Sequence, residues 1–132
     1  MRLVVNFPYL NMLKITSIYG GQPERVISAY TPRRYPKRFE NIAVAKNTYN
    51  DIDVTADKIF CLYVNRTDNE TFHSTEGVEI HALTLQGEPL YRLLVDEPLR
   101  YFAADEKNDK LFGLTADGQC YQYDLSNLVK FL

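Results

Sequence analysis

The stretch Asp57–Asp96 decides the fold: DKIFCLYV at 57–64, a polar segment at 65–77, and GVEIHALTLQGEPLYRLLVD at 77–96. Val78–Leu85 alternates polar and apolar residues, and Gln86-Gly87 can turn the chain into a returning strand at Leu90–Val95. Lys58–Val64 is instead apolar on both faces. A strand of that kind is covered on both sides, so we expect it in the middle of a packed stack.

The first strand of this stretch returns later in the chain. Asp57–Leu62 overlays Asp109–Leu114 at an offset of 52, with the same Asp, Lys, Phe and Leu residues. Ile80–Leu85 overlays Cys120–Leu125 at an offset of 40, and the polar segment accounts for the difference. A four-stranded unit repeated at about 40 to 50 residues is typical of the blades of a β-propeller.

Further strands are predicted on both sides of this stretch. They are Arg2–Phe7, Met12–Tyr19, Arg25–Tyr30, Asn50–Asp57, Leu99–Asp105, Lys110–Thr115 and Cys120–Leu125. We therefore predict an all-β chain forming a partial β-propeller of consecutive antiparallel four-stranded blades. Residues 1–40 would be an incomplete blade with a basic loop, 41–96 a complete blade, and 97–132 an incomplete last blade.

Four segments between Tyr49 and Leu125 carry a family resemblance: YNDIDVTADKIFCLYVNR, EIHALTLQGEPLYRLLVD, RYFAADEKNDKLFGLT and YQYDL. They resemble the TolB-like six-bladed β-propellers common in gut Bacteroidetes. The resemblance implies that this shorter chain corresponds to about two and a half C-terminal blades. Full-length members are typically exported, often as lipoproteins, which implies a periplasmic or cell-surface location for them. The start MRLVVNFPYL does not match a signal peptide, so the sequence assigns this chain no location.

Composition and charge limit the partners. No run of about 18 apolar residues occurs, so we expect no membrane span. Residues 1–50 contain eight Lys or Arg against two acidic residues, a net +6, whereas residues 51–132 contain seven against fifteen, a net −8. This asymmetry indicates either head-to-tail association, contact with an anionic partner, or simply loops on different faces. Because an incomplete propeller leaves apolar blade faces exposed, we predict a homo-oligomer.

Two loops are candidate partner-binding segments. TPRRYPKRFE at 31–40 interleaves basic and aromatic residues, a composition suited to single-stranded nucleic acid, but no second basic stripe supports that reading. A solvated connection, or a loop that binds a protein or glycan, is therefore favoured for this segment and for the polar one at 65–77. The candidate residues are Arg33, Arg34, Tyr35, Lys37, Arg38, Asn65, Arg66 and His73.

Residues suited to catalysis are few. His73 and His81 have no carboxylate at a recognised ligand spacing, and Cys61 and Cys120 are expected to be buried free thiols, although the sequence leaves a disulfide open. Asp51 and Asp53 could point two carboxylates to one side of a strand, as glycosidases require, but aspartates that cap turns at strand ends are far commoner. The chain also lacks GxSxG, Walker A and GxGxxG motifs. We therefore assign no catalytic, cofactor-binding or metal-binding residue and expect no cofactor.

The sequence favours a non-catalytic binding or scaffold module with a protein or glycan ligand. The alternative is the remnant of a propeller hydrolase or lyase, with acidic or His side chains at a central channel. A truncated product without an independent role is the third reading.

Overall fold

The computed structural model describes residues 2–10, 12–17, 25–27 and 46–132. Its strands are β1 (Arg2–Phe7), β2 (Met12–Ser17), β3 (Arg25–Ile27), β4 (Lys46–Val54), β5 (Lys58–Thr67), β6 (Val78–Thr84), β7 (Pro89–Val95), β8 (Leu99–Asp105), β9 (Lys110–Thr115), β10 (Cys120–Asp124) and β11 (Val129–Phe131). One α-helix, α1 (Asp68–His73), and the short 3-10 helices η1 (Pro8–Leu10), η3 (Glu106–Asn108) and η4 (Leu125–Asn127) complete the described elements. The predicted all-β class is confirmed.

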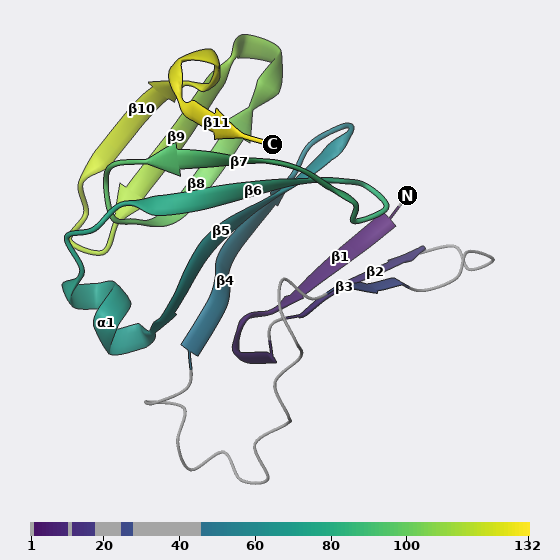
Figure 1. The fold of residues 1–132 in the computed structure, drawn as a ribbon, viewed down its shortest axis with the longest axis horizontal. Coiled ribbons are helices and arrows are strands. Elements are labelled where there is room, and N and C mark those ends of the chain that lie inside the picture. The colour runs from purple at the N-terminus through teal and green to yellow at the C-terminus, as the bar shows by residue number, and fades with distance from the viewer. Residues whose placement is uncertain (1, 11, 18–24, 28–45) are drawn as a thin grey trace, which may run out of the picture.

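The described strands form three antiparallel sheets (Figure 1). Sheet A has the order β1-β2-β3, sheet B the order β11-β7-β6-β5-β4, and sheet C the order β10-β9-β8. Consecutive strands pair as hairpins within each sheet, with registers such as Val4↔Ile15 in sheet A and Phe60↔Ala82 in sheet B. Short connections of this kind make neighbours in sequence neighbours in space.

Strand β5 in sheet B is buried on both of its faces, as the apolar pattern of Lys58–Val64 predicted. Ile59 and Cys61 pack toward sheet A, whereas Phe60 and Leu62 pack toward sheet C, and all four are fully buried. The cluster between sheets B and C contains Phe60, Leu62, Val64, Val78, Ile80, Ala82, Leu93, Val95, Leu99, Phe102 and Leu111. The cluster between sheets A and B contains Leu13, Ile15, Tyr49, Ile59, Cys61 and Leu83. The alternation along β5 therefore supplies two cores at once.

The sequence repeat corresponds to equivalent places in two sheets. Asp57–Leu62 leads into β5 and Asp109–Leu114 into β9, and each is the second strand of its sheet counted along the chain. The overlay of Ile80–Leu85 on Cys120–Leu125 likewise matches β6 with β10, the two third strands. The first strands of the sheets also meet, since β4 contacts both β1 and β8. The repeat therefore describes two sheets built alike and stacked on each other.

The last strand lies outside this repeat. After β10 the chain turns through η4, and β11 pairs antiparallel with β7, with Lys130 opposite Leu93. Sheet B thereby has five strands instead of the four predicted for the complete blade, and sheets A and C have three each among the described residues. The prediction of three strands for the last sheet is confirmed. The sheets stack but do not close into a ring in this chain (Figure 1).

Two predicted turns take the geometry that their residues allow. Gly87 and Gly118 have φ of 86° and 89°, a region that side chains rarely adopt, and they turn β6 into β7 and β9 into β10. Asp109, which ends η3, has φ of 56°. The hairpin expected at Gly20-Gly21 lies outside the described residues.

Candidate functional site

The polar segment at 65–77 contains a helix, which the sequence reading missed. Thr67 caps α1: its hydroxyl accepts a hydrogen bond from the Glu70 backbone N–H at 3.1 Å, and the Glu70 carboxylate accepts from the Thr67 N–H at 3.5 Å. This reciprocal pair is a capping box, and its Thr-x-x-Glu pattern was visible in the sequence. Three of the candidate residues lie in or next to this helix. Asn65 and Arg66 are at the end of β5, just before α1, and His73 is the last residue of α1.

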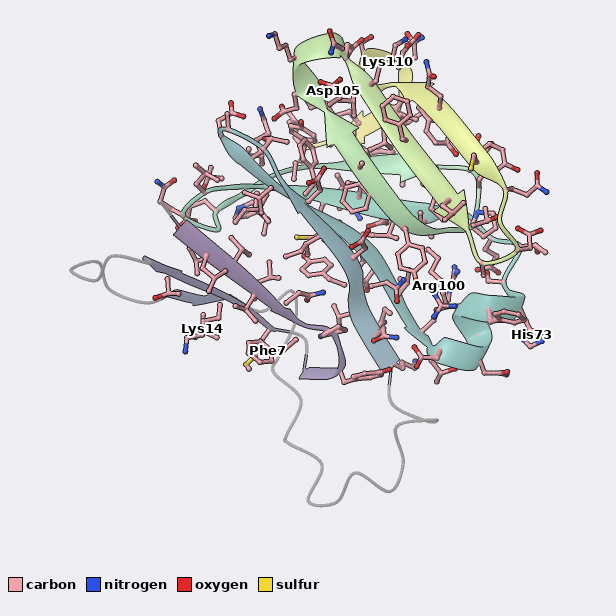
Figure 2. The ribbon with its side chains drawn as sticks, turned by 180° about the vertical axis from the view of Figure 1, so that it is seen from behind. Phe7, Lys14, His73, Arg100, Asp105 and Lys110 are labelled. Carbon is pink, nitrogen blue, oxygen red and sulfur yellow. The ribbon has the colours of Figure 1, made fainter. Side chains whose placement is uncertain are left out.

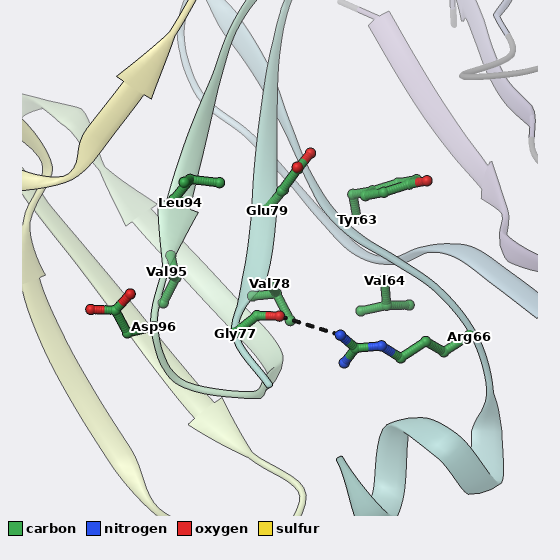
Figure 3. A pocket seen from close by; sticks show the side chains of 9 residues that line it. All are labelled: Tyr63, Val64, Arg66, Gly77, Val78, Glu79, Leu94, Val95 and Asp96. Atoms are coloured by element: carbon green, nitrogen blue, oxygen red, sulfur yellow. Dashed lines mark hydrogen bonds between the residues drawn. The ribbon is translucent and has the colours of Figure 1, made fainter. Parts of the chain in front are cut away.

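Arg66 fastens the helical segment to sheet B. Its guanidinium donates to the Ser74 hydroxyl at 2.8 Å, to the Glu76 carboxylate at 3.1 Å and to the Gly77 carbonyl at 3.4 Å. Figure 3 shows it reaching from the end of β5 across to Gly77. It borders a cavity of about 370 Å³ lined by Tyr63, Val64, Arg66, Gly77, Val78, Glu79, Leu94, Val95 and Asp96. Arg66 is therefore committed to bonds within the chain.

Gly77 makes this closure possible. A Cβ on Gly77 would lie 2.2 Å from the Val95 carbonyl oxygen, a distance that real Cβ atoms essentially never show. The backbone entering β6 can therefore approach the end of β7 only because residue 77 has no side chain. Asn65, also at this end of the sheet, has φ of 47°, a region in which asparagine is enriched.

A second cavity of about 370 Å³ lies beside α1, the helix that carries His73 (Figure 2). It is lined by Thr71, Phe72, His73, Ser74, Thr75, Pro98, Thr115, Ala116 and Asp117. We call it the α1 cleft; it lies between α1 and the turn joining β9 to β10. His73 is exposed, its Nδ1 lies 3.1 Å from the Asn69 carbonyl oxygen, and its ring meets the Phe72 ring edge-on at 5.1 Å. Of the predicted loop residues, Arg66 borders the first cavity and His73 borders the α1 cleft.

The other candidate residues lie outside the described part of the chain. They are Arg33, Arg34, Tyr35, Lys37 and Arg38.

A row of polar side chains crosses sheet B on the side of sheet A, and the sequence reading did not find it. The Tyr49 hydroxyl lies 2.9 Å from His81 Nδ1, His81 Nε2 lies 2.9 Å from a Glu79 carboxylate oxygen, and Arg92 pairs with Glu79 at 3.2 Å. Tyr63 stacks on the His81 ring with centroids 4.7 Å apart. Glu79 and His81 are two apart on a strand and so share a face, which was the available signal.

Burial lowers the pKa of His81, opposed in part by its hydrogen bond to Glu79. Tyr49 at the inner end of the row is 5% exposed, whereas the Arg92 side chain at the outer end is half exposed. The row therefore runs from a buried phenol to solvent through a neutral imidazole. It positions β4, β6 and β7 relative to one another.

Asp51 and Asp53 do share a direction, but their carboxylates serve the neighbouring sheet. Asp51 Oδ2 accepts from the Phe102 N–H at 3.0 Å, and Asp53 Oδ2 accepts from the Ala104 N–H at 2.7 Å. The expectation that these aspartates cap turns is wrong, because β8 is an edge strand whose free N–H groups face β4. Burial raises the pKa of Asp51, against the two backbone hydrogen bonds that it accepts.

The two cysteines do not pair with each other. Both cysteines are free thiols; Cys61 is buried as expected, but Cys120 is exposed, because its strand β10 lies at the outer edge of sheet C. Burial raises the pKa of the Cys61 thiol. Within the described residues, no three His, Cys, Asp or Glu side chains gather closely enough to hold a metal ion. The helices in this part of the chain are all too short to cross a bilayer.

No family model matches the chain, and neither a curated protein nor a solved structure matches it.

Proposed function

We propose that the chain is a non-catalytic binding or scaffold module, built as a segment of a β-propeller, which associates with a second copy of itself through its two outer sheet faces. The TolB-like resemblance belongs to this proposal. Support comes from the stacking of the three sheets and from the contacts of β4 with both β1 and β8, since first strands converge in a propeller. The ligand would be a protein or glycan.

One comparison carries the self-association. Phe112 in β9 occupies the place that Phe60 occupies in β5, according to both the sequence overlay and the strand order. Phe60 is fully buried because sheet C covers it, whereas Phe112 is 43% exposed on the outer face of sheet C. Tyr101 lies in the adjacent strand β8, two residues before Ala103, which pairs with Phe112, and it is 48% exposed. The outer face of sheet C thus resembles a face that lacks its following sheet.

The outer face of sheet A is suited to cover it. Leu3 and Val26, on the side of sheet A away from sheet B, are 48% and 60% exposed. Sheet A belongs to the half of the chain with net charge +6 and sheet C to the half with −8. Opposite charge favours contact between these unlike faces over contact between like faces. Such head-to-tail contacts make a ring if the rotation closes, and two copies would then contribute six sheets.

Light scattering coupled to size exclusion tests the association. We expect a dimer or larger ring at micromolar concentration, and a monomer after Phe112→Ser. Phe72→Ser is the matched control, because Phe72 is 58% exposed on α1 and away from both outer faces. Circular dichroism checks that each variant is folded. A wild-type protein that is strictly monomeric overturns the proposal.

The hydrolase or lyase alternative has less support. Asp51 and Asp53, the paired carboxylates on which it depends, already accept hydrogen bonds from the backbone of β8.

A further inference from the structure

The geometry points to the α1 cleft as a binding site for a neutral saccharide. This inference deepens the proposed binding function and rests on it, but it does not depend on self-association. The cleft volume of about 370 Å³ falls within the range of about 300–1,000 Å³ of small-ligand sites. Its two walls come from α1 and from the β9–β10 turn.

An aromatic ring stands at the rim of the cleft. Phe72 is 58% exposed and its ring is held edge-on by His73 at 5.1 Å, so a large apolar surface faces solvent beside a hydrogen-bonding imidazole. The C–H face of a sugar ring packs on an aromatic face of this kind, while its hydroxyls seek polar partners at the edge. A purely apolar ligand would leave those polar partners unused.

The polar groups of the cleft can both accept and donate. Asp117 Oδ1 accepts from the Thr115 hydroxyl, which leaves Oδ2 available as an acceptor within the described part of the chain. The Nδ1 atom of His73 lies against the Asn69 carbonyl, which leaves Nε2 directed elsewhere. Vicinal hydroxyls of a sugar match an acceptor and an imidazole at neighbouring positions.

A buried hydroxyl supplies an independent indication. Thr71 is only 8% exposed, it lines the cleft, and its Oγ1 has no hydrogen-bond partner among the described residues. A buried polar atom without a partner costs free energy. The Thr71 hydroxyl is itself shielded from solvent, so a ligand that pairs with it must first turn this side chain toward the cleft. Among the described residues no Lys or Arg lines the cleft, and Asp117 is its one carboxylate. A neutral ligand is therefore favoured over a phosphorylated or acidic one.

Titration of the ¹⁵N-labelled full chain with maltose, cellobiose and lactose tests the inference. We expect shifts of the backbone amides at 71–75 and 115–117 with at least one of these sugars, and weaker shifts with glucuronic acid because Asp117 repels it. Phe72→Ala and Asp117→Asn should each weaken binding about tenfold or more, while Phe112→Ser should bind as the wild type does. Absence of shifts at tens of millimolar sugar, or shifts that Phe72→Ala leaves unchanged, overturns the inference. If sugars fail to bind but the chain still associates through Phe112, only this inference is lost.

Discussion

The two faces of sheet B are covered in different ways. The face toward sheet C carries the larger apolar cluster, and its polar contacts lie along the β4–β8 edge, where Asp51 and Asp53 accept from backbone N–H groups. The face toward sheet A carries a smaller apolar cluster crossed by the row from Tyr49 through His81 to Arg92. One interface therefore depends mainly on buried area, and the other also depends on the ionisation of a histidine.

The largest expected effect is on the B–C face. Phe60→Ala removes a fully buried ring from the centre of that cluster, and we expect the free energy of unfolding to fall by about 3–5 kcal/mol. Urea unfolding followed by circular dichroism measures it. Phe112→Ala, at the equivalent place in sheet C, should lower the free energy of unfolding of the monomeric protein by less than about 1 kcal/mol. Equal costs at the two positions would contradict the assignment of Phe60 to a covered face.

A smaller effect is expected at the edge of the same interface. Asp53→Ala leaves the Ala104 N–H without its acceptor, and we expect a loss of about 1–3 kcal/mol. Hydrogen exchange at Ala104 should accelerate together with the fall in stability. Asp53→Asn retains a carbonyl acceptor and is the matched control, with a smaller loss. An exchange rate at Ala104 that Asp53→Ala leaves unchanged would show that the carboxylate does not protect β8.

The A–B face should respond to pH. Because burial lowers the pKa of His81, the unfolded chain binds more protons than the folded chain below about pH 6.5. Stability should therefore decrease as the pH falls through that range. His81→Gln should flatten this dependence in unfolding experiments between about pH 7.5 and 5. A slope of the same sign and size in His81→Gln refutes the prediction.

A second buried group, Asp51, opposes the pH dependence that His81 produces. Burial raises the pKa of Asp51, so protonation of Asp51 at lower pH favours the folded state. Its contribution has the opposite sign to that of His81. Because the two contributions have opposite signs, removal of His81 should leave the opposing slope of Asp51 in the unfolding data.

The smallest effect is expected at the outer rim. Arg92, the exposed end of the polar row, also lies 5.7 Å from the Phe131 ring centroid, and Phe131 in β11 is 44% exposed. An exposed cation–π contact contributes about 0.5–1 kcal/mol. Phe131→Ala should therefore lower stability by no more than about 1 kcal/mol, whereas Phe131→Tyr should retain the contact and the stability. A loss comparable with that of Phe60→Ala would mean that β11 contributes to the core.

Local patterns predicted the strands well because the alternation of β6 and the two-sided apolar pattern of β5 depend only on neighbouring residues. The repeat matched β5 with β9 and β6 with β10 because both pairs occupy equivalent places in their sheets. The pairing of β11 with β7 could not be predicted, since Val129–Phe131 is too short to carry a period. The row through His81 joins residues 32 apart in sequence, and contacts at that range depend on register. The capping box at Thr67 was readable and was overlooked.

The pairing of β11 with β7 has a mechanical consequence. Sheet C is a length of chain whose two ends are fastened side by side at one edge of sheet B. A force applied at the C-terminus is therefore borne first by the β7–β11 ladder, and the hairpins of sheet C are loaded only after that ladder opens. Folding of sheet C brings these two ends together and so lowers the entropy cost of pairing β11 with β7.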